Sequence, residues 1–313
     1  MACCFEIIKT FSVFVFGIQL VFGVFRWIYQ NVIGPKFLKP INLREFGSWA
    51  LVTGATDGIG RQFAKSLAER GFNIILVSRT LPKLQEVANE ISQSFNVETK
   101  VIAVDFTSGP EIYDQIKKQI AGIEIGVLVN NVGMFYGAPQ YFLDLSDLDK
   151  SIQEIIRCNV TSVPMMCSLV LPQMVERKRG LIINISSVTS VIPYPNGALY
   201  SASKAFVGKF SNDLAAEYEH QGITIQALIT GSVGTKMTRL KGGTLATPTP
   251  RQYVESALRF VGYAGYTTGY LPHSIMQQFL VQFMHFVAPS YTKKLISKSL
   301  RAARVKLFLK DDK

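Results

Sequence analysis

The stretch Trp49-Ala-Leu-Val-Thr53-Gly-Ala-Thr-Asp-Gly-Ile-Gly60 decides the fold of this chain. Its first five residues form an apolar run typical of a buried parallel strand, and a helical pattern follows through about Arg70. The three glycines allow a tight turn and let a pyrophosphate approach the free N–H groups at the start of the helix. Strand before and helix after therefore predict a dinucleotide-binding turn. Its expected cofactor contacts are Gly54, Thr56, Asp57, Gly58, Ile59 and Gly60.

Strand and helix signals alternate from this turn onward. Further strands are predicted at 73–78, 99–104, 126–130, 181–185 and 223–229, with helical patterns between them. Such alternation predicts an α/β fold: a single Rossmann-type, doubly wound parallel sheet with helices on both faces. Ligands bind such sheets at the carboxyl ends of the strands. Five residues with suitable chemistry stand at these ends: Gly54, Asp105, Asn130, Ser187 and Thr230.

The end of the second strand indicates which dinucleotide binds. An NAD site has an acidic residue there to hold the ribose 2′-hydroxyl, but this chain has Ser78-Arg79-Thr80. Because Arg79 would pair with a 2′-phosphate, we interpret the cofactor as NADP(H). The alternative is a solvated arginine at a helix start. Asp105 stands where a carboxylate would bind adenine, and the loop Asn130-Asn131-Val132-Gly133 could brace the strand or the adenosine.

The stretch Tyr200-Ser-Ala-Ser-Lys204 carries the candidate chemistry. A tyrosine and a lysine four residues apart lie on one face of a helix, where the ammonium would lower the pKa of the phenol. Such a tyrosine could pass a proton to or from an alcohol oxygen near neutral pH. Taken alone, the pair also occurs by chance on solvated helices.

Together these motifs resemble the short-chain dehydrogenase/reductase family over about residues 47–270. The resemblance rests on Thr-Gly-x3-Gly-x-Gly at 53–60, Asn-Asn-Val-Gly at 130–133, Asn159, Ser187 and Tyr-x3-Lys at 200–204. It implies that Tyr200 donates or accepts the proton and that Ser187 hydrogen-bonds the substrate carbonyl. It also implies that Lys204 binds the nicotinamide ribose and tunes Tyr200, and that Asn159 holds a water in the proton relay. Further cofactor contacts would come from Asn131, Val132, Gly133, Val233 and Thr235.

Several segments look like one membrane-bound branch of that family. Asp105-Phe, Ala121-Gly-Ile-Glu-Ile-Gly126 and Arg157-Cys-Asn-Val resemble the branch of 17β-hydroxysteroid dehydrogenases and very-long-chain 3-oxoacyl-CoA reductase. Phe135-Tyr136 and Thr267-Thr-Gly-Tyr270 look most like its member hydroxysteroid dehydrogenase-like protein 1. In vertebrate versions of that protein, phenylalanine replaces the catalytic tyrosine, whereas this chain keeps Tyr200.

The loop after the sixth strand departs from the pattern of the branch. The branch usually has a proline and then Val-x-Thr, but this chain has Thr230-Gly-Ser-Val-Gly-Thr235. Losing proline and gaining glycines is expected to loosen the loop. Residues 236–262 are predicted to form a substrate lid, with a mobile first half and a helix that begins at Thr249-Pro250.

The two ends of the chain point to a membrane. Residues 1–46 are predicted to be an anchor and linker, since Phe11 to Phe25 is almost wholly apolar and Arg26, Trp27 and Tyr29 follow it. We expect either an uncleaved anchor or a hairpin. The basic residues that follow place the domain at 47–272 on the cytosolic side. In residues 273–313, an apolar stripe from Ile275 to Val287 predicts a helix that lies on the membrane or packs on the core.

Charge and cysteines exclude other classes of function. Of the net +11, most lies in residues 291–313, which suits either an anionic membrane surface or a solvated tail. The sequence contains no stripe of aromatic and basic residues of the kind that would suggest nucleic-acid binding. The four cysteines have neither metal-ligand spacing nor a disulfide pattern, as expected in a reducing compartment.

The leading hypothesis is therefore an NADPH-dependent reductase of a lipid ketone, either a 3-oxoacyl-CoA or a 17-ketosteroid. We expect it at the endoplasmic reticulum membrane with a cytosolic active site. The resemblance leaves a mitochondrial location open, and it implies a homodimer paired through the helix at 200–219. The rival hypothesis is a catalytically weak or inactive cofactor-binding protein.

Overall fold

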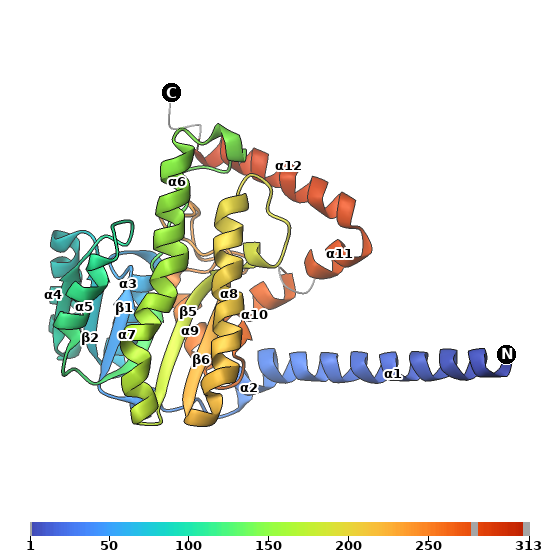
Figure 1. Ribbon diagram of the computed structural model, residues 1–313, viewed down its shortest axis with the longest axis horizontal. Coiled ribbons are helices and arrows are strands. Elements are labelled where there is room, and N and C mark those ends of the chain that lie inside the picture. The colour runs from blue at the N-terminus through green and yellow to red at the C-terminus, as the bar shows by residue number, and fades with distance from the viewer. Residues whose placement is uncertain (1, 277–280, 309–313) are drawn as a thin grey trace.

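A seven-stranded, wholly parallel sheet forms the centre of the molecule (Figure 1). The computed structural model describes residues 2–276 and 281–308. The strand order is β3-β2-β1-β4-β5-β6-β7, so the order reverses between β1 and β4 and opens a crevice at their carboxyl ends. The strands are β1 (Trp49–Thr53), β2 (Asn73–Ser78), β3 (Thr99–Ala103), β4 (Ile125–Asn130), β5 (Gly180–Ser187), β6 (Ile223–Thr230) and β7 (Tyr266–Thr267).

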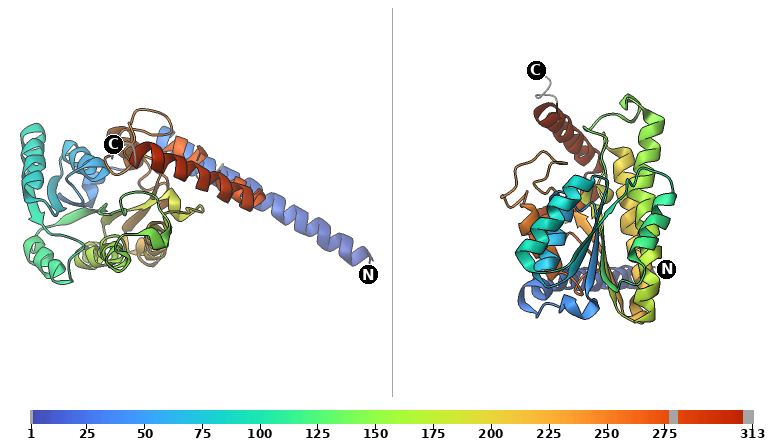
Figure 2. Two further views of the ribbon diagram at one scale, coloured as in Figure 1. Left: turned by 90° about the horizontal axis from the view of Figure 1, so that it is seen from above. Right: turned by 90° about the vertical axis from the view of Figure 1, so that its left-hand side faces the viewer.

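Helices cover both faces of the sheet, as Figure 2 shows edge-on. One face carries α3 (Gly58–Glu69), α4 (Leu81–Phe95) and α9 (Pro250–Arg259). The other carries α5 (Glu111–Ile120), α7 (Ser162–Glu176) and α8 (Ala198–Tyr218). The apolar strand runs are buried on both sides, which explains why they lack alternation. The predicted doubly wound α/β fold is confirmed, while β7 was not predicted because two residues carry no recognisable pattern.

The N-terminal helix α1 (Ala2–Ile28) projects from the body of the molecule (Figure 1). Its 27 residues would extend about 40 Å, enough to cross a bilayer core of about 30 Å. From Phe11 to Phe25 its large apolar side chains face outward, with Phe22 70% exposed. It is one continuous helix rather than a hairpin. A second apolar stretch, Leu148–Glu176, is half buried and includes α6 (Leu148–Ile155) and the core helix α7.

The base of α1 is docked on the domain that holds the sheet. A π-helical turn (Tyr29–Ile33) and α2 (Gly34–Phe37) follow α1. The buried Asn31 amide donates to the Trp27 carbonyl at 3.0 Å and accepts from the Ser274 hydroxyl at 2.7 Å. The Tyr263 hydroxyl donates to the Lys39 carbonyl. These contacts join the apolar helix to the domain without a free linker.

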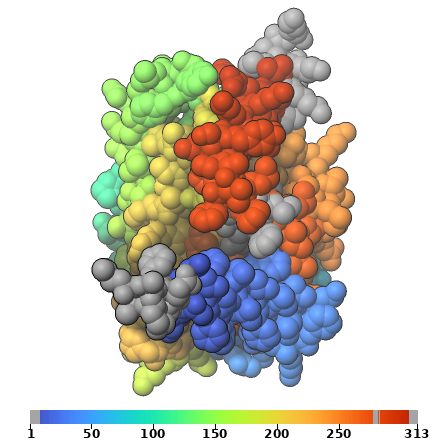
Figure 3. Space-filling model, turned by 90° about the vertical axis from the view of Figure 1, so that its right-hand side faces the viewer, coloured from blue at the N-terminus to red at the C-terminus, as the bar shows by residue number. Residues whose placement is uncertain are grey.

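The C-terminal segment consists of α10 (Leu271–His273), α11 (Val281–Val287) and α12 (Pro289–Phe308). The predicted apolar stripe lies partly outside the described residues, at 277–280. In α11, Phe283 is 59% and Val287 is 63% exposed, so this part of the stripe does not pack on the core. In Figure 3, the red C-terminal helices lie above the blue α1 on the same face of the molecule.

The lid predicted over 236–262 stays a prediction. Its second half is α9, whose Tyr253 and Val254 are fully buried, and Glu255 pairs with Arg70 of α3 at 2.7 Å. A helix with a buried apolar face and an ion pair to its neighbour belongs to the core. Only the residues before it are therefore free to form a cover.

Candidate active site

The glycine turn lies at the carboxyl end of β1, beside the switch in strand order. Gly54 has φ +64° and Gly58 has φ +54°, a region that favours glycine. A Cβ atom on Gly60 would lie 2.3 Å from the Gly54 carbonyl oxygen, so only glycine fits there. Asp57 caps α3 by accepting from the Gly58 N–H at 2.7 Å. The turn thus presents closely packed backbone at the start of a helix.

The loop after β4 holds this turn in place. The Asn131 side chain donates to the carbonyl oxygens of Thr53 at 3.0 Å and Gly54 at 3.2 Å. The Thr53 hydroxyl in turn accepts from the N–H groups of Asn131 and Val132, both at 3.0 Å. Of the two roles considered for this loop, Asn131 performs the structural one and braces the strand.

Polar groups gather at the ends of β2 and β3, where the adenosine end of a dinucleotide was predicted. Arg79 is exposed, and no residue in the described part of the chain forms an ion pair with it. Beside it the hydroxyls of Thr56 and Ser78 lie 3.2 Å apart. Asp105 uses one carboxylate oxygen to accept from Thr107, which leaves the other oxygen for a ligand. A ligand at this end of the sheet could therefore contact a cation, two hydroxyls and a carboxylate.

Tyr200 and Ser187 meet at the carboxyl end of the sheet. Tyr200 lies in the first turn of α8, and Ser187 is the last residue of β5. Burial raises the pKa of Tyr200 to about 12, the hydrogen bond from Ser187 opposes this rise, and the nearby Tyr194 adds to it. The Ser187 oxygen accepts from the N–H and the hydroxyl of Thr189 at 3.2 and 3.0 Å, so its own proton points away from Thr189 and serves Tyr200.

The expectation that the Lys204 ammonium lowers the pKa of Tyr200 is wrong. The ammonium lies 5.9 Å from the centre of the Tyr200 ring and donates to the Ile185 carbonyl at 2.8 Å. Burial therefore decides the pKa of the phenol, which rises instead of falling. Burial also lowers the pKa of Lys204 itself to about 8. The two side chains share one pocket, but they are not directly bonded.

Asn159 joins the pocket to the loop after β4. It lies in a π-helical turn (Ile156–Thr161) between α6 and α7 and is 1% exposed. Its amide oxygen accepts from the Met134 N–H at 2.8 Å. Its nitrogen donates to the Met134 carbonyl at 3.0 Å and to the Ser203 hydroxyl at 3.1 Å. Its side chain is thus engaged by the protein, and the predicted water relay stays a prediction.

The space beside Lys204 tests whether a nicotinamide nucleotide fits. A Cβ atom on Gly133 would lie 3.2 Å from the Lys204 nitrogen and 3.5 Å from the Asn159 amide oxygen. Glycine therefore leaves an open cradle next to the ammonium. This cradle, the glycine turn and the cation at Arg79 lie along one edge of the sheet. The residues present fit an extended dinucleotide with a phosphate at its adenosine end.

The loop after β6 is held by a residue that sequence reasoning missed. The Thr238 hydroxyl donates to the Val233 carbonyl at 2.7 Å and accepts from the Thr235 N–H at 3.2 Å. Val233 is buried, and the Thr235 methyl lies against Gly58. The threonine provides a fixed point in a loop whose glycines were expected to loosen it.

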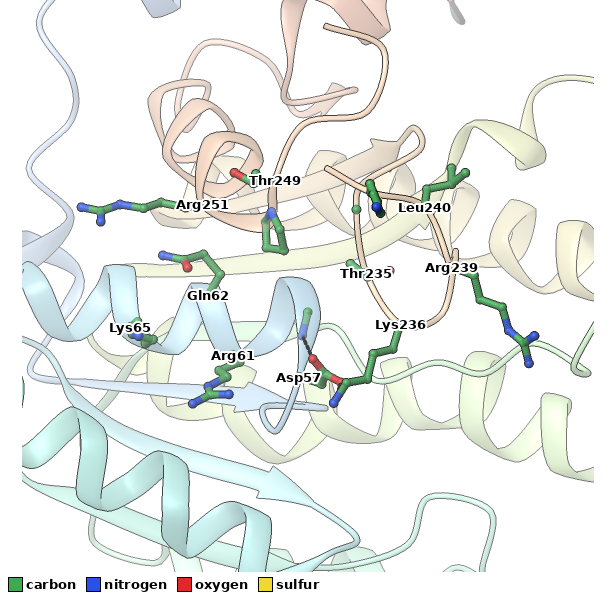
Figure 4. Close-up of a pocket in the computed structure, with 14 residues that line it drawn as sticks. Asp57, Arg61, Gln62, Lys65, Thr235, Lys236, Arg239, Leu240, Thr249 and Arg251 are labelled. Atoms are coloured by element: carbon green, nitrogen blue, oxygen red, sulfur yellow. Dashed lines mark hydrogen bonds and ion pairs between the residues drawn. The ribbon is translucent and has the colours of Figure 1, made fainter. Parts of the chain in front are cut away.

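A basic cleft of about 720 Å³ opens between α3 and this loop (Figure 4). Lys236 pairs with Asp57 across it at 3.0 Å, and Arg61 pairs with Glu90 at 2.7 Å. Lys65 and Arg251 also line it. Sequence reasoning missed these cations because they come from three separate segments. Their only sequence signal is that Arg61 directly follows the last glycine of the turn.

Aromatic rings enclose the other side of Tyr200. The Phe135 ring meets the Tyr200 ring edge-on at 5.1 Å and stacks on Tyr136 at 4.5 Å. Burial raises the pKa of Tyr136 to about 12, and the charge of Tyr194 adds to the rise. These rings form a half-buried aromatic wall with protonated phenols, a surface suited to the chain of a lipid.

Comparison with known proteins points to the family that the sequence motifs resemble. The family model for short chain dehydrogenases matches residues 48–244. A very-long-chain 3-oxoacyl-CoA reductase from Mus musculus is 47% identical over 281 residues, which cover 88% of this chain and 87% of the relative. The likeness to hydroxysteroid dehydrogenase-like protein 1 stays a prediction.

Solved structures share the fold. A 7β-hydroxysteroid dehydrogenase is 26% identical, with a TM-score of 0.70 over 82% of this chain and 100% of that one. A short-chain dehydrogenase from Sphingobium yanoikuyae, solved in complex with NADPH, is 27% identical, with a TM-score of 0.61. It covers 68% of this chain and 83% of its own.

Proposed function

Since this chain belongs to the short-chain dehydrogenase family and is an oxidoreductase, we propose that it reduces a very-long-chain 3-oxoacyl-CoA with NADPH. The observation that carries the proposal is the meeting of Tyr200 and Ser187 beside an aromatic wall. The reductase names of the relatives support the acyl-CoA over the steroid as substrate.

Ser187 and Tyr200 would act on the oxygen of the substrate ketone. NADPH, when bound, supplies the hydride for the carbonyl carbon. Ser187 would turn its proton from Tyr200 to that oxygen, because Thr189 donates both of its hydrogen bonds to Ser187 and does not accept from it. Tyr200 is protonated at neutral pH, since its pKa is raised to about 12. It is thus in the state required to give a proton to the developing alkoxide.

Lys204 and Asn159 would prepare the pocket for this transfer. The ammonium of Lys204 faces the cradle at Gly133, where a ribose hydroxyl could accept from it. Asn159 fixes the Met134 backbone and thereby the shape of the cradle. Lys204 is a cofactor-binding candidate by its position, and Asn159 is a positioning residue.

Purified full-length protein tests the reaction directly. We expect it to oxidise NADPH in the presence of a long-chain 3-oxoacyl-CoA and to form the 3-hydroxyacyl-CoA, followed by absorbance and mass spectrometry. If the protein reduces a 17-ketosteroid but not the 3-oxoacyl-CoA, the steroid replaces the acyl-CoA as the proposed substrate. NADPH binding without turnover of either would favour the cofactor-binding protein without catalysis.

Arg79 is expected to set the cofactor preference. The variant Arg79→Gln should raise the Kd for NADPH by about tenfold to a hundredfold, because a charge-assisted contact to a phosphate contributes about 1.5–3 kcal/mol. The Kd for NADH should change little. Titration of nucleotide fluorescence measures both constants, and the exposed Lys83→Gln of α4 is the control. An equal change in the two constants would refute the assignment.

The location of the protein follows from α1 and its flanking charges. We propose that α1 anchors it in the endoplasmic reticulum membrane with the catalytic domain in the cytosol. The exposed apolar face of α1 and the basic residues after it support this orientation. Protease added to intact microsomes should digest the domain, whereas protection, or co-fractionation with mitochondria, would refute the proposal. Dimerisation through α8 stays a prediction that light scattering can measure.

A further inference from the structure

A second cleft, of about 550 Å³, opens on the substrate side of the molecule. One wall is the loop before α8 and the first residues of that helix, with Tyr194, Ala198 and Ser201. The other wall is α12, with Lys293, Lys294 and Arg301. Figure 3 shows the red C-terminal helices lying against the yellow segment of α8. The cleft is therefore formed by segments that are almost a hundred residues apart in the sequence.

The α12 wall carries positive charge without a counter-charge. Lys293 and Arg301 stand eight residues apart on one face of the helix, and α12 contains no acidic residue. In the described part of the chain, no carboxylate pairs with Lys293, Lys294 or Arg301. Arg301 donates to the Ser297 carbonyl within its own helix, at 3.4 Å. Clustered cations around a hollow favour a ligand with several negative charges, and phosphate suits the forked guanidinium.

Tyr194 connects this cleft with the reacting groups. It lines the cleft, and a Cβ atom on Gly197 would lie 2.3 Å from the Tyr194 ring and 3.7 Å from the Phe135 ring. Tyr194 therefore lies beside the ring that meets Tyr200 edge-on at 5.1 Å. A ligand with its ketone at Tyr200 could therefore extend past Tyr194 toward the cations of α12. The cleft is thus placed for the end of the substrate that is remote from the reacting carbonyl.

We propose that this cleft binds the phosphate groups of the coenzyme A part of the substrate. The inference rests on the proposed function. An acyl-CoA carries a pyrophosphate and a 3′-phosphate at the far end of its pantetheine arm, whereas a 17-ketosteroid carries no anionic group. Cations at this place are useful only to the first of these substrates. The cleft therefore distinguishes two substrate classes that the sequence leaves open.

The other basic cleft does not suit this role. It borders Gly58 and Thr235 at the cofactor end of the site, and its Lys236 and Arg61 are already paired with carboxylates. Phosphates of the nucleotide would compete for it. The cleft at α12 has unpaired cations and lies beside the substrate wall instead.

Two substrates that share the acyl chain and the pantetheine arm test the site. One is 3-oxohexadecanoyl-CoA, and the other is the matching pantetheine thioester, which has the same acyl chain but neither the phosphates nor the adenosine; the charge variant then separates the loss of phosphate contacts from the loss of the nucleoside. The triple variant Lys293→Gln, Lys294→Gln, Arg301→Gln should raise KM for the CoA thioester by about tenfold to a hundredfold, because three exposed charge contacts are lost. KM for the pantetheine thioester should not change. The control variant removes three other exposed charges: Lys117→Gln, Lys118→Gln and Lys298→Gln.

A binding measurement keeps the inference separate from the proposed function. With NADPH saturating the cofactor site, calorimetry should show that adenosine 3′,5′-bisphosphate binds the wild type at least tenfold more tightly than the triple variant. If the wild type binds it in this way but reduces neither thioester, the proposed function fails and the phosphate site stands. Equal effects on the two thioesters, or no effect on either, would overturn the site. So would loss of binding to phosphatidylserine vesicles with an unchanged KM, because the cations would then serve a membrane surface.

Discussion

Tyr200→Phe is expected to lower kcat for ketone reduction by about 10²–10⁴, because it removes the general acid and little else. The ring would keep its edge-on contact with Phe135, and Ser187 would still offer a hydrogen bond to the substrate oxygen. Binding of NADPH should therefore stay close to that of the wild type. Initial rates at saturating NADPH, together with a nucleotide titration, separate the chemical step from binding.

The matched control for this variant lies on the same helix. Tyr218→Phe makes the same chemical change at the far end of α8, and it should leave kcat unchanged. If Tyr200→Phe keeps more than about a tenth of the wild-type kcat, the proton comes from another group. Tyr136 and Tyr194 are the neighbouring phenols that would then be tested, since the pKa of each is also raised by burial.

Lys204→Met is expected to abolish most activity and yet to stabilise the fold at neutral pH. Burial lowers the pKa of Lys204 from 10.5 to about 8, so holding the ammonium in the folded state costs about 3 kcal/mol at pH 7. Methionine removes this cost but leaves the Ile185 carbonyl without its donor, which offsets about 1–2 kcal/mol. The net gain in the free energy of unfolding should be about 1–2 kcal/mol.

The pH dependence gives this prediction a definite sign. The folded-state pKa lies below the unfolded one, so between about pH 8 and 10.5 the unfolded chain binds more protons. Wild-type stability should therefore rise through this window, and the advantage of Lys204→Met should disappear by its upper end. Denaturant unfolding at pH 7 and pH 10.5 measures both. Lys209→Met, an exposed lysine of the same helix paired with Asp213, should show no such change; a variant less stable than the wild type at pH 7 would contradict the argument.

The fold could be predicted from the sequence because it depends on local spacing. The same spacing predicted that the candidate site residues gather at the carboxyl ends of the strands. The glycine turn, the strand ends and the Tyr200–Lys204 pair follow from neighbours in the chain. The predicted direction of the Tyr200 pKa shift was wrong. The spacing of Tyr200 and Lys204 indicates that a charge is near, but it does not indicate that burial removes water from the phenol. The Ile185 carbonyl that holds Lys204 lies on another strand, and no local pattern identifies it.

Other features of the site depend on contacts between remote segments. The Thr238 hydroxyl holds a loop that its glycines were expected to loosen. Helix α9 was included in the predicted lid because it follows a glycine-rich stretch, and the sequence does not show that Tyr253 and Val254 pack into the core. The basic α12 was interpreted as a tail, and its place beside Tyr194 required the tertiary structure.

The hydrogen bonds of Asn31 have a consequence for how the protein works in a bilayer. Asn31 lies in the π-helical turn directly after α1 and is bonded to Ser274, which in turn is bonded to Thr268 just after β7. With α1 inserted, the domain could not swivel about a flexible tether, and its tilt and height above the lipid would be set by this joint. The mouth of the active site would then stay at one depth in the membrane interface. The protein would select lipids whose carbonyl group lies at that depth.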